Sequence, residues 1–404
     1  IGHGDLIPFD MGGTSTDISL ITGGEAAIAS DRRFAGQRVG LQSLDIVSIG
    51  AGGGSIARVD AGGVLHVGPE SAGALPGPAC YGRGGTAATV TDANLVLGYL
   101  DPGNFLGGRA RLDAAAAEAA VDRIAAALGV DRMAAAEGIH RVVNTRMAEG
   151  VRLVSVRRGI DPRRFALLSF GGAAGLHITE IARRLALRRV IVPRLAAVLS
   201  AWGMLATDLR YELARTHIGV ASALSADALR SIYREMEEEG RARLAAARFA
   251  GPVRVRRSAD MRYGEQIFEI PVELDAIDWS RADLVPQMAE AFHTRHEALY
   301  TYALRDQEAV LVNARVAVIG ALPALPAEPA RAASAPAPAR SRRRVHLGAW
   351  QEVAVFGFDD LAAGQAVEGP AIVESSTTTV LLRAGDRAEV TPLGWLDVAV
   401  RGRG

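Results

Sequence analysis

Short apolar runs alternate with turn residues over the first seventy positions, and this pattern is typical of β-strands. It predicts antiparallel strands at Leu6–Asp10, Thr16–Ile21 and Ala26–Ser30, followed by a hairpin through Ile56–Val67. Residues 68–85 are too rich in Gly and Pro for regular structure. A loop of that length inside a compact domain is usually functional or disordered, and its small uncharged residues favour order.

The apolar spacing changes to steps of three and four after residue 113, which indicates amphipathic helices. Helices are expected over Asp113–Leu128 and from Asp131 to about Arg158. The apolar stripe of the second helix is Ile139, Val143, Met147, Val151 and Val154. Strands at 164–170 and 188–193 then alternate with helices at 176–186 and 197–208. This order predicts an α/β fold with a mixed sheet for residues 1–209.

The rest of the chain divides by composition into three parts. Residues 210–320 alternate charged helices with strands and are expected to form an α+β domain, in which Pro271 marks an edge strand. Residues 321–343 hold five prolines and are expected to be a linker. Residues 344–404 show short strands with Gly and Pro turns, the pattern of a small all-β domain.

Composition narrows the possible functions. The 45 acidic and 45 basic residues balance, so no nucleic-acid partner is expected. The sequence contains no Lys, which excludes a Schiff-base lysine and a P-loop lysine within it. Cys80 is the only cysteine, and we find no signal peptide or bilayer-length apolar run, so a cytoplasmic protein is expected. The chain opens without Met almost directly on a strand, as a piece of a longer protein would.

The motif "FDMGGTSTD" (9–17) carries the strongest chemical signal. Gly12 and Gly13 allow positive φ and close approach of a ligand, while Thr14, Ser15 and Thr16 add hydroxyls to a possible anion nest. Asp10 and Asp17 would repel a phosphate directly. They are instead suited to hold Mg²⁺ through its waters, or to orient an attacking group. The alternative is a polar hairpin turn.

A second glycine-rich stretch, "LLSFGGAAGLH" (167–177), reads as a strand, a turn and a helix start. Gly171, Gly172 and Gly175 would suit the adenosine and α-phosphate of a nucleotide. The stretch is neither a Rossmann fingerprint nor a Walker loop. The alternative is a tight strand-to-helix turn.

Cys80 offers a candidate metal ligand, for which Asp45 and His177 are the partners we would name, with Zn²⁺ or a similar ion. A nucleophilic cysteine and a small buried apolar residue are the alternatives. Asp92 is expected to cap a helix, and Asn94 just inside it is a weak ligand candidate.

The pairing of a DxGG(T/S) hairpin with a downstream GGxxG turn resembles the actin/hexokinase/Hsp70 class of ATPases. Taken with "IGAGGGSIARVDAGG", "VGPESAGALPGPACYGRGG", "FLGGR", "SADMRYGEQ" and "GPAIVESSTTTV", the chain resembles the hydantoinase A / 5-oxoprolinase family over its whole length. The resemblance implies one half of an actin-like (ribonuclease H-like) ATPase domain. It also implies an oligomer that works with a hydantoinase B type partner.

The activity that this resemblance implies is ATP-dependent opening of a cyclic amide, such as a hydantoin or 5-oxoproline, by phosphoryl transfer to the amide oxygen. ATP and Mg²⁺ are the implied cofactors. Ketone-carboxylase subunits of the family tend to have TTAK where this chain has TSTD, which favours the amide. A ketone carboxylase subunit and a non-catalytic docking scaffold remain the alternatives. The family's first DxGGT hairpin does not occur in residues 1–404, so this piece alone is expected to be inactive.

Overall fold

The computed structural model describes residues 2–29, 32–34, 36–39, 43–264, 266–325 and 336–401. The chain forms two compact units, one of Ile1–Trp202 with Ala327–Gly404 and the other of Gly203–Pro326. No helix within the described ranges is both long and apolar enough to cross a bilayer. Part of the expected linker, residues 326–335, lies outside the described residues, as does Ser30 of the expected third strand.

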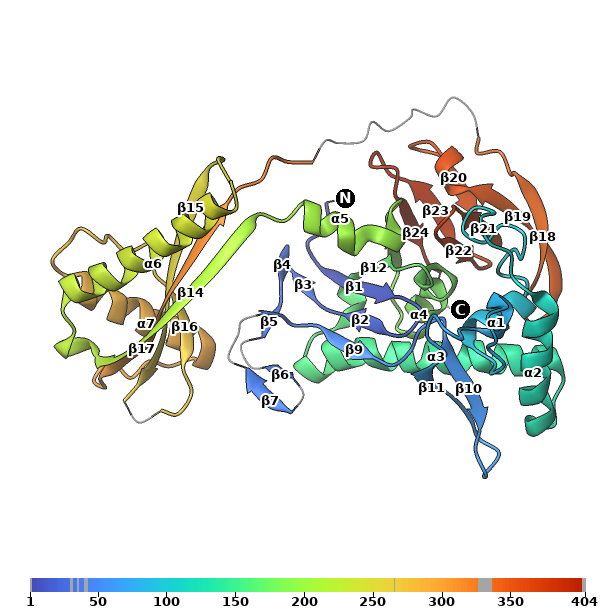
Figure 1. Ribbon diagram of the computed structural model, residues 1–404, viewed down its shortest axis with the longest axis horizontal. Helices are drawn as coiled ribbons and strands as arrows, with labels where there is room; N and C mark the ends of the chain where they lie inside the picture. Colours follow the sequence, from blue (N-terminus) through green and yellow to red (C-terminus); the bar gives the residue numbers. More distant parts are fainter. Residues whose placement is uncertain are drawn as a thin grey trace. The chain divides into compact units, whose positions relative to one another are not determined.

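The first unit is built on a mixed sheet with the strand order β20-β23-β24-β13-β12-β1-β2-β9 (Figure 1). Its central strands β1 (Leu6–Met11), β12 (Ala166–Phe170) and β13 (Arg189–Val192) run parallel, while β2 (Thr16–Ile18) and β9 (Val47–Ile49) are antiparallel to their neighbours. This confirms the α/β fold with a mixed sheet.

The remaining strands of the N-terminal region are short. The strand expected over Thr16–Ile21 is interrupted after Ile18, where residues 19 and 20 leave the ladder. The remaining strands before residue 72 are β3 (Ile21–Thr22), β4 (Glu25–Ala26), β5 (Ile28–Ala29), β6 (Arg32–Phe34), β7 (Gln37–Val39), β8 (Ser43–Leu44), β10 (Ser55–Val59) and β11 (Leu65–Ser71). The last two form the expected hairpin, which projects from the sheet (Figure 1).

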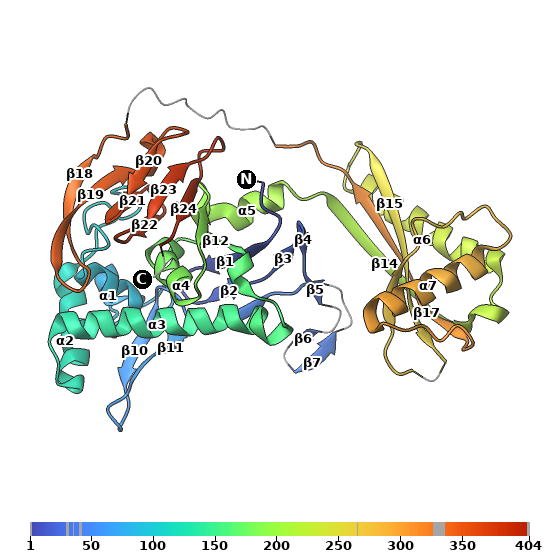
Figure 2. The same ribbon diagram turned by 180° about the vertical axis from the view of Figure 1, so that it is seen from behind.

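The helices that begin in the first unit are α1 (Val90–Val96), α2 (Ala114–Leu128), α3 (Arg132–Val154), α4 (Ile178–Arg184) and α5 (Leu199–Leu205). Of these, α3 and α4 pack against strands of the main sheet. Asp113 and Asp131 cap α2 and α3 through their side chains, and Gly129 ends α2 with φ +67°. All five residues of the predicted apolar stripe of α3 are buried. That helix packs against β2 and β9 of the main sheet and against β11 of the hairpin (Figure 2).

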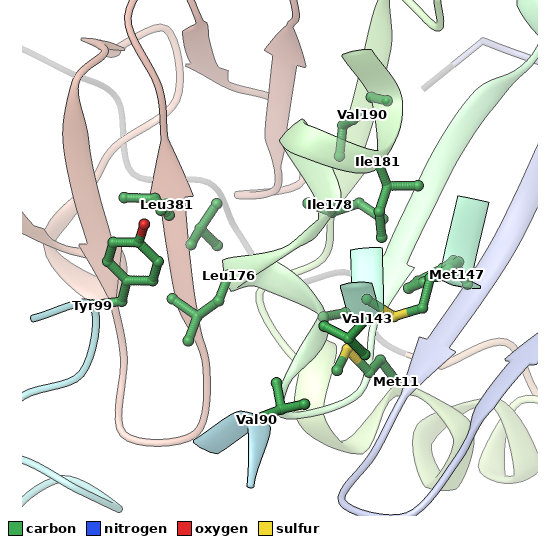
Figure 3. Packing of buried hydrophobic residues seen from close by; sticks show 14 of the residues in the cluster. Met11, Val90, Tyr99, Val143, Met147, Leu176, Ile178, Ile181, Val190 and Leu381 are labelled. Atoms are coloured by element: carbon green, nitrogen blue, oxygen red, sulfur yellow. The ribbon is translucent and has the colours of Figure 1, made fainter. Parts of the chain in front are cut away.

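The core of the first unit joins segments that are far apart in sequence. Met11 at the end of β1 lies beside Val143 and Met147 of α3, and Val90 of α1 packs nearby (Figure 3). Leu381, from the C-terminal strands, belongs to the same buried cluster. The C-terminal segment is therefore part of this core.

The structure differs here from the separate β domain expected at 344–404. Three of its strands, β20 (Ala366–Glu368), β23 (Arg387–Val390) and β24 (Leu396–Ala399), extend the main sheet beyond β13. The other strands form a second sheet of β18 (Ser341–His346), β19 (Trp350–Gly357), β21 (Ala371–Glu374) and β22 (Thr379–Leu382). Apolar residues of these strands, among them Val355, Ile372 and Leu381, belong to the single core cluster of the first unit. A separate domain of about sixty residues would bury a smaller fraction of its surface.

The second unit is a four-stranded sheet with two helices, as the expected α+β arrangement has it. Its order is β14-β17-β15-β16, with β14 (Leu209–Val220), β15 (Val253–Tyr263), β16 (Ile270–Glu273) and β17 (Ala309–Gly320). The helices are α6 (Ala226–Ala246) and α7 (Leu284–Tyr300). Pro271 lies in the edge strand β16, as predicted, because proline has no backbone N–H to donate to a second neighbouring strand.

Candidate functional site

The hairpin between β1 and β2 presents Gly12, Gly13 and Thr14 at the carboxyl edge of the parallel strands, the edge where α/β sheets bind ligands. The tip closes through a hydrogen bond from the N–H of Gly12 to the carbonyl of Ser15 at 3.1 Å, and Gly13 and Thr14 are exposed. Neither glycine has the positive φ expected from the sequence. A Cβ at Gly12 or Gly13 would meet no atom of the described residues within 4 Å. The glycines therefore keep the space in front of the hairpin open.

A second glycine run, residues 50–54, supports the hairpin from behind. The N–H groups of Gly53 and Gly54 donate to the carbonyls of Gly12 and Gly13, the first at 3.0 Å. A Cβ at Gly52 would lie 2.8 Å from the backbone of Gly13 and Thr14, so only glycine permits this contact. The hairpin tip is thus held from behind by main-chain hydrogen bonds.

Thr16 helps to hold the hairpin against the glycine run at residues 50–54. Its side chain is fully buried, and its Oγ1 donates to the carbonyl oxygen of Ala51 at 2.5 Å. The hydroxyl predicted to touch phosphate is therefore engaged with the protein. Of the other residues of this loop, Gly13 and Thr14 are exposed, and Gly12 and Ser15 are half-buried.

Asp10 and Asp17 are directly opposite each other across the β1–β2 pair. Ser200, at the start of α5, donates its hydroxyl to Asp10 Oδ2 at 2.9 Å. Burial raises the pKa of Asp10 above its usual 3.8, the bond from Ser200 opposes this, and the charge of Asp17 raises it further. The site thus holds two carboxylates whose mutual repulsion a cation would relieve. The sequence offered no signal for Ser200, which is 190 residues from Asp10.

Asp10→Asn is expected to raise the melting temperature at pH 7 by roughly 1–3 °C, because it removes one of two facing carboxylates and keeps an acceptor for Ser200. Since folding raises this pKa, the unfavourable contribution of Asp10 develops as pH rises above 3.8 and is absent below it. The gain should therefore vanish near pH 3. Calorimetric melting at both pH values measures it, and a lower melting temperature at pH 7 would contradict the repulsion.

The second glycine loop connects β12 to α4 and touches the end of β1. Gly171 has φ +83°, and a Cβ there would overlap the Met11 carbonyl oxygen and Asp10 Oδ1. Gly175 packs in the same way against the carbonyl oxygen of Thr379. Gly172 is exposed, so it is the one predicted residue of this loop that is open to a ligand. The structure brings this loop and Asp10 together, as a nucleotide site would need.

A buried polar chain lies behind this loop and was not predicted. Asn94 Nδ2 donates to His177 Nε2 at 3.1 Å, and His177 Nδ1 donates to Asn144 Oδ1 at 2.8 Å. Asn144 Nδ2 in turn donates to His140 Nδ1 at 2.9 Å, and His140 Nε2 reaches the carbonyl of Leu176 at 3.4 Å. Each imidazole carries one proton in this arrangement. Burial lowers the pKa of His177 to about 3, with Arg383 adding to the effect, and burial lowers that of His140 as well.

Acid is therefore expected to destabilise the first unit through these histidines. The unfolded His177 ring binds a proton below about pH 6.5 and the folded ring does not until about pH 3, so the free energy of unfolding falls as pH falls through this window. The pKa of His140 is shifted in the same direction and adds to the effect. The slope is up to about 1.4 kcal/mol per pH unit for each ring. His177→Asn, measured by urea unfolding from pH 7 to 4.5, should lose part of the slope. An unchanged slope in His177→Asn would exclude His177 as its source.

The structure does not bring together the three residues proposed to hold a metal. Asp45 forms an ion pair with Arg158, His177 is engaged in the polar chain, and Cys80 packs with Leu95 and other apolar residues. Within the described ranges no three His, Cys, Asp or Glu side chains are grouped to hold a metal ion. Burial and then the nearby Asp92 charge raise the pKa of the Cys80 thiol, which disfavours the thiolate that a ligand or nucleophile requires.

Asp92 organises the Gly/Pro loop. The N-cap of α1 is Thr89, one turn earlier than expected, and Asp92 completes its capping box. The Asp92 carboxylate is fully buried and accepts from the N–H groups of Ala79 (3.2 Å), Cys80 (2.8 Å) and Thr89 (2.9 Å), and from the Thr89 hydroxyl (2.7 Å). It thus ties the loop to α1, whose Thr91 donates to the carbonyl of Gly53.

Comparison with known proteins relates this chain to a family. The hydantoinase/oxoprolinase family matches residues 1–213, and the C-terminal domain of the same family matches residues 220–393. Caprolactamase subunit alpha of Pseudomonas jessenii is 40% identical over 401 residues, which cover 97% of this chain and 58% of that protein. The chain therefore spans little more than half the length of this relative.

Solved structures give the same result. The crystal structure of the ATP-dependent caprolactamase from Pseudomonas jessenii matches with a TM-score of 0.76 at 38% identity, covering 99% of this chain and 59% of the other. A nucleotide-free structure of acetone carboxylase matches with a TM-score of 0.86 at 26% identity, with the same coverage. On the family match, which takes in both halves of the sequence, the chain belongs to the hydantoinase/oxoprolinase family.

Proposed function

We propose that this chain is part of an ATP-dependent hydrolase that opens a cyclic amide by phosphoryl transfer to the amide oxygen. The observation that carries the proposal is the open Gly12–Ser15 hairpin, which joins the two strands on which Asp10 and Asp17 lie opposite each other. The 40% identity to a caprolactamase subunit supports a lactam as the substrate class.

The backbone N–H groups of Gly13, Thr14 and Ser15 would bind the terminal phosphates, because successive N–H groups in a turn form an anion-binding nest. Nothing in the described structure fills the space in front of Gly12 and Gly13, so a phosphate oxygen can approach the main chain closely. The exposed Gly172 would contact the remainder of the nucleotide.

Mg²⁺ fits this arrangement. Two facing carboxylates, one with a pKa raised by burial and by its neighbour, form a hard-oxygen site whose repulsion a divalent cation relieves. Asp10 and Asp17 would hold the ion through its waters, and Ser200 would keep Asp10 oriented. When bound, Mg²⁺ neutralises charge on the phosphate oxygens. Zn²⁺ at Asp45, Cys80 and His177 does not fit, since these residues are not grouped.

In the proposed reaction the amide oxygen attacks the γ-phosphorus, and the bond from phosphorus to the β,γ-bridging oxygen breaks to release ADP. Water adds to the phosphorylated ring carbon, and the carbon–nitrogen bond then breaks to give an amine and an acyl phosphate. A second water hydrolyses the acyl phosphate to a carboxylate and inorganic phosphate. Phosphorylation makes a poor leaving group a good one, so the role of this chain is to position the γ-phosphoryl group.

A hydantoinase B type subunit is the proposed partner, and turnover is expected from the assembled enzyme rather than from residues 1–404 alone. Two alternatives remain, an ATP-dependent ketone carboxylase subunit and a non-catalytic scaffold. The acetone carboxylase match supports the first alternative at the level of fold. The TSTD sequence after Gly13 supports the amide.

The test is phosphate release by the assembled enzyme. A lactam, a hydantoin or 5-oxoproline should stimulate ATP hydrolysis and be opened in equal amount. Stimulation by acetone with bicarbonate, and by none of the cyclic amides, would favour the carboxylase. If the assembled protein does not bind ATP, the non-catalytic scaffold is the alternative that remains.

A further inference from the structure

The second unit contains a pocket that the proposed function does not use. Its volume is about 560 Å³, a size typical of sites for small molecules. It is bounded by the short turn Ala221–Ala223, by α7 as far as His293, and by the turn 305–308 that leads into β17. All of these segments belong to the second unit, so the pocket can be described within that unit alone.

One buried side chain presents an unused donor to this pocket. His293 lines the pocket but is only 9% exposed, and its Nδ1 lies 2.8 Å from the hydroxyl oxygen of the fully buried Tyr263. That oxygen accepts from the N–H of Leu304 at 2.8 Å, so the hydroxyl proton is donated to His293 Nδ1. Burial lowers the pKa of His293 and the charge of Arg305 lowers it further, which keeps the ring neutral at pH 7.

The single ring proton of His293 is therefore on Nε2. This nitrogen has no hydrogen-bond partner among the described residues. A nearly buried donor without a partner is costly, and an acceptor on a ligand in the pocket would supply one. Arg305 offers a second donor, because its Nη1 donates to Glu290 and its Nη2 lies 3.7 Å from Glu297, while its Nε makes no hydrogen bond to a described residue. A carboxylate is the acceptor that suits these two donors together.

The turn that follows Arg305 carries the opposite charge. Asp306 and Glu308 both line the pocket, and the Oγ of Ser222 lies 3.1 Å from each carboxylate oxygen of Glu308. Because the charge of Arg305 is already paired with acidic side chains, these two carboxylates leave the pocket with a net negative charge. An ammonium group would be attracted there, and an anion without a positive charge of its own would be repelled.

Apolar side chains complete the lining. Leu224 follows the turn Ala221–Ala223, and Val285, Pro286 and Ala289 come from one side of α7 at steps of one and three residues. They offer no hydrogen-bonding side chain, so the part of a ligand that lies against them should be a hydrocarbon.

We propose that this pocket binds an aliphatic amino carboxylate, with its carboxylate at His293 and Arg305 and its ammonium group at Glu308. A simple carboxylate would leave the acidic turn unpaired, and a simple amine would leave the donor of His293 without an acceptor. The site does not depend on the proposed function. The product of that reaction would belong to the same class of ligand, because opening a lactam leaves an amine and a carboxylate on one carbon chain.

The test is calorimetric titration of the assembled protein with 6-aminohexanoate, hexanoate and hexylamine in the absence of ATP. The amino carboxylate should bind at least about tenfold more tightly than either of the other two, since each of these lacks one charged end. Equal affinity for hexanoate or hexylamine would contradict the proposal. So would the absence of 6-aminohexanoate binding up to about 10 mM.

Glu308→Gln shows whether this pocket is the site of binding. Glu308 is exposed, and glutamine keeps an acceptor for Ser222, so the variant should fold normally. It should weaken 6-aminohexanoate about tenfold and bind hexanoate no more weakly than the wild type does. Glu238→Gln, at an exposed position of α6 outside the pocket, is the matched control and should change neither affinity.

His293→Asn tests the buried donor. The asparagine oxygen can still accept from Tyr263, whereas the Nε2 proton is lost, so 6-aminohexanoate should bind about five- to tenfold more weakly and hexylamine should be unaffected. Unchanged 6-aminohexanoate binding in Glu308→Gln or in a folded His293→Asn would overturn the assignment. The titration requires neither ATP nor turnover, so this failure would leave the proposed function standing, and a failure of ATP-dependent ring opening would leave the pocket standing.

Discussion

Gly13→Val is expected to abolish ATP hydrolysis by the assembled enzyme, with a loss of about 100-fold or more, while the fold remains intact. The position has ordinary φ, and a Cβ would meet no atom of the described residues within 4 Å, so the protein itself tolerates the side chain. The branched side chain would occupy the space in front of the hairpin and displace the γ-phosphoryl group. Phosphate release and circular dichroism together measure both parts of the prediction.

Two other glycines serve as controls for this variant. Gly264 is also unobstructed and has ordinary φ, but it lies in the second unit, so Gly264→Val should keep full activity. Gly52→Val should lose activity and stability together, because its Cβ overlaps the backbone of Gly13 and Thr14. Full ATP hydrolysis by the Gly13→Val variant would show that the hairpin does not bind the phosphates of ATP.

Asp92→Ala should lower the free energy of unfolding by about 3–5 kcal/mol, since it leaves several buried donors unsatisfied at once. Three of these donors are the backbone N–H groups of Ala79, Cys80 and Thr89, which have little freedom to find other partners. The loop 68–85 and the start of α1 should loosen together. Urea unfolding followed by circular dichroism gives the change in stability.

Asp113→Ala is the matched comparison for this loss. Asp113 also accepts from a backbone N–H at a helix start, but at an exposed position, so its removal should cost only about 1 kcal/mol. A similar small loss for Asp92→Ala would show that the buried carboxylate does not hold the loop. Asp92→Asn, which keeps one acceptor oxygen, should fall between the two.

The pattern of neighbouring residues was sufficient to predict the elements that are stabilised by contacts close in sequence. The three- and four-residue spacing placed α3 and its buried stripe correctly, and Asp113, Asp131 and Gly129 marked helix ends, because a cap or an apolar stripe is encoded within a few neighbouring residues. The Gly12–Ser15 hairpin was visible for the same reason. Its glycines were expected to provide positive φ, whereas the structure uses them to leave space.

The sequence by itself thus determined the family, the α/β class, the long helices and the residues of the glycine loops. Only the tertiary structure showed that the C-terminal strands complete the main sheet, that Ser200 bonds to Asp10, and that Asn94 and His177 belong to one buried chain. It also separated Cys80 from Asp45 and His177. These contacts join residues that are tens to hundreds of positions apart. They depend on which surfaces the folded chain buries against each other, and the spacing of residues along a sequence does not determine which surfaces these are.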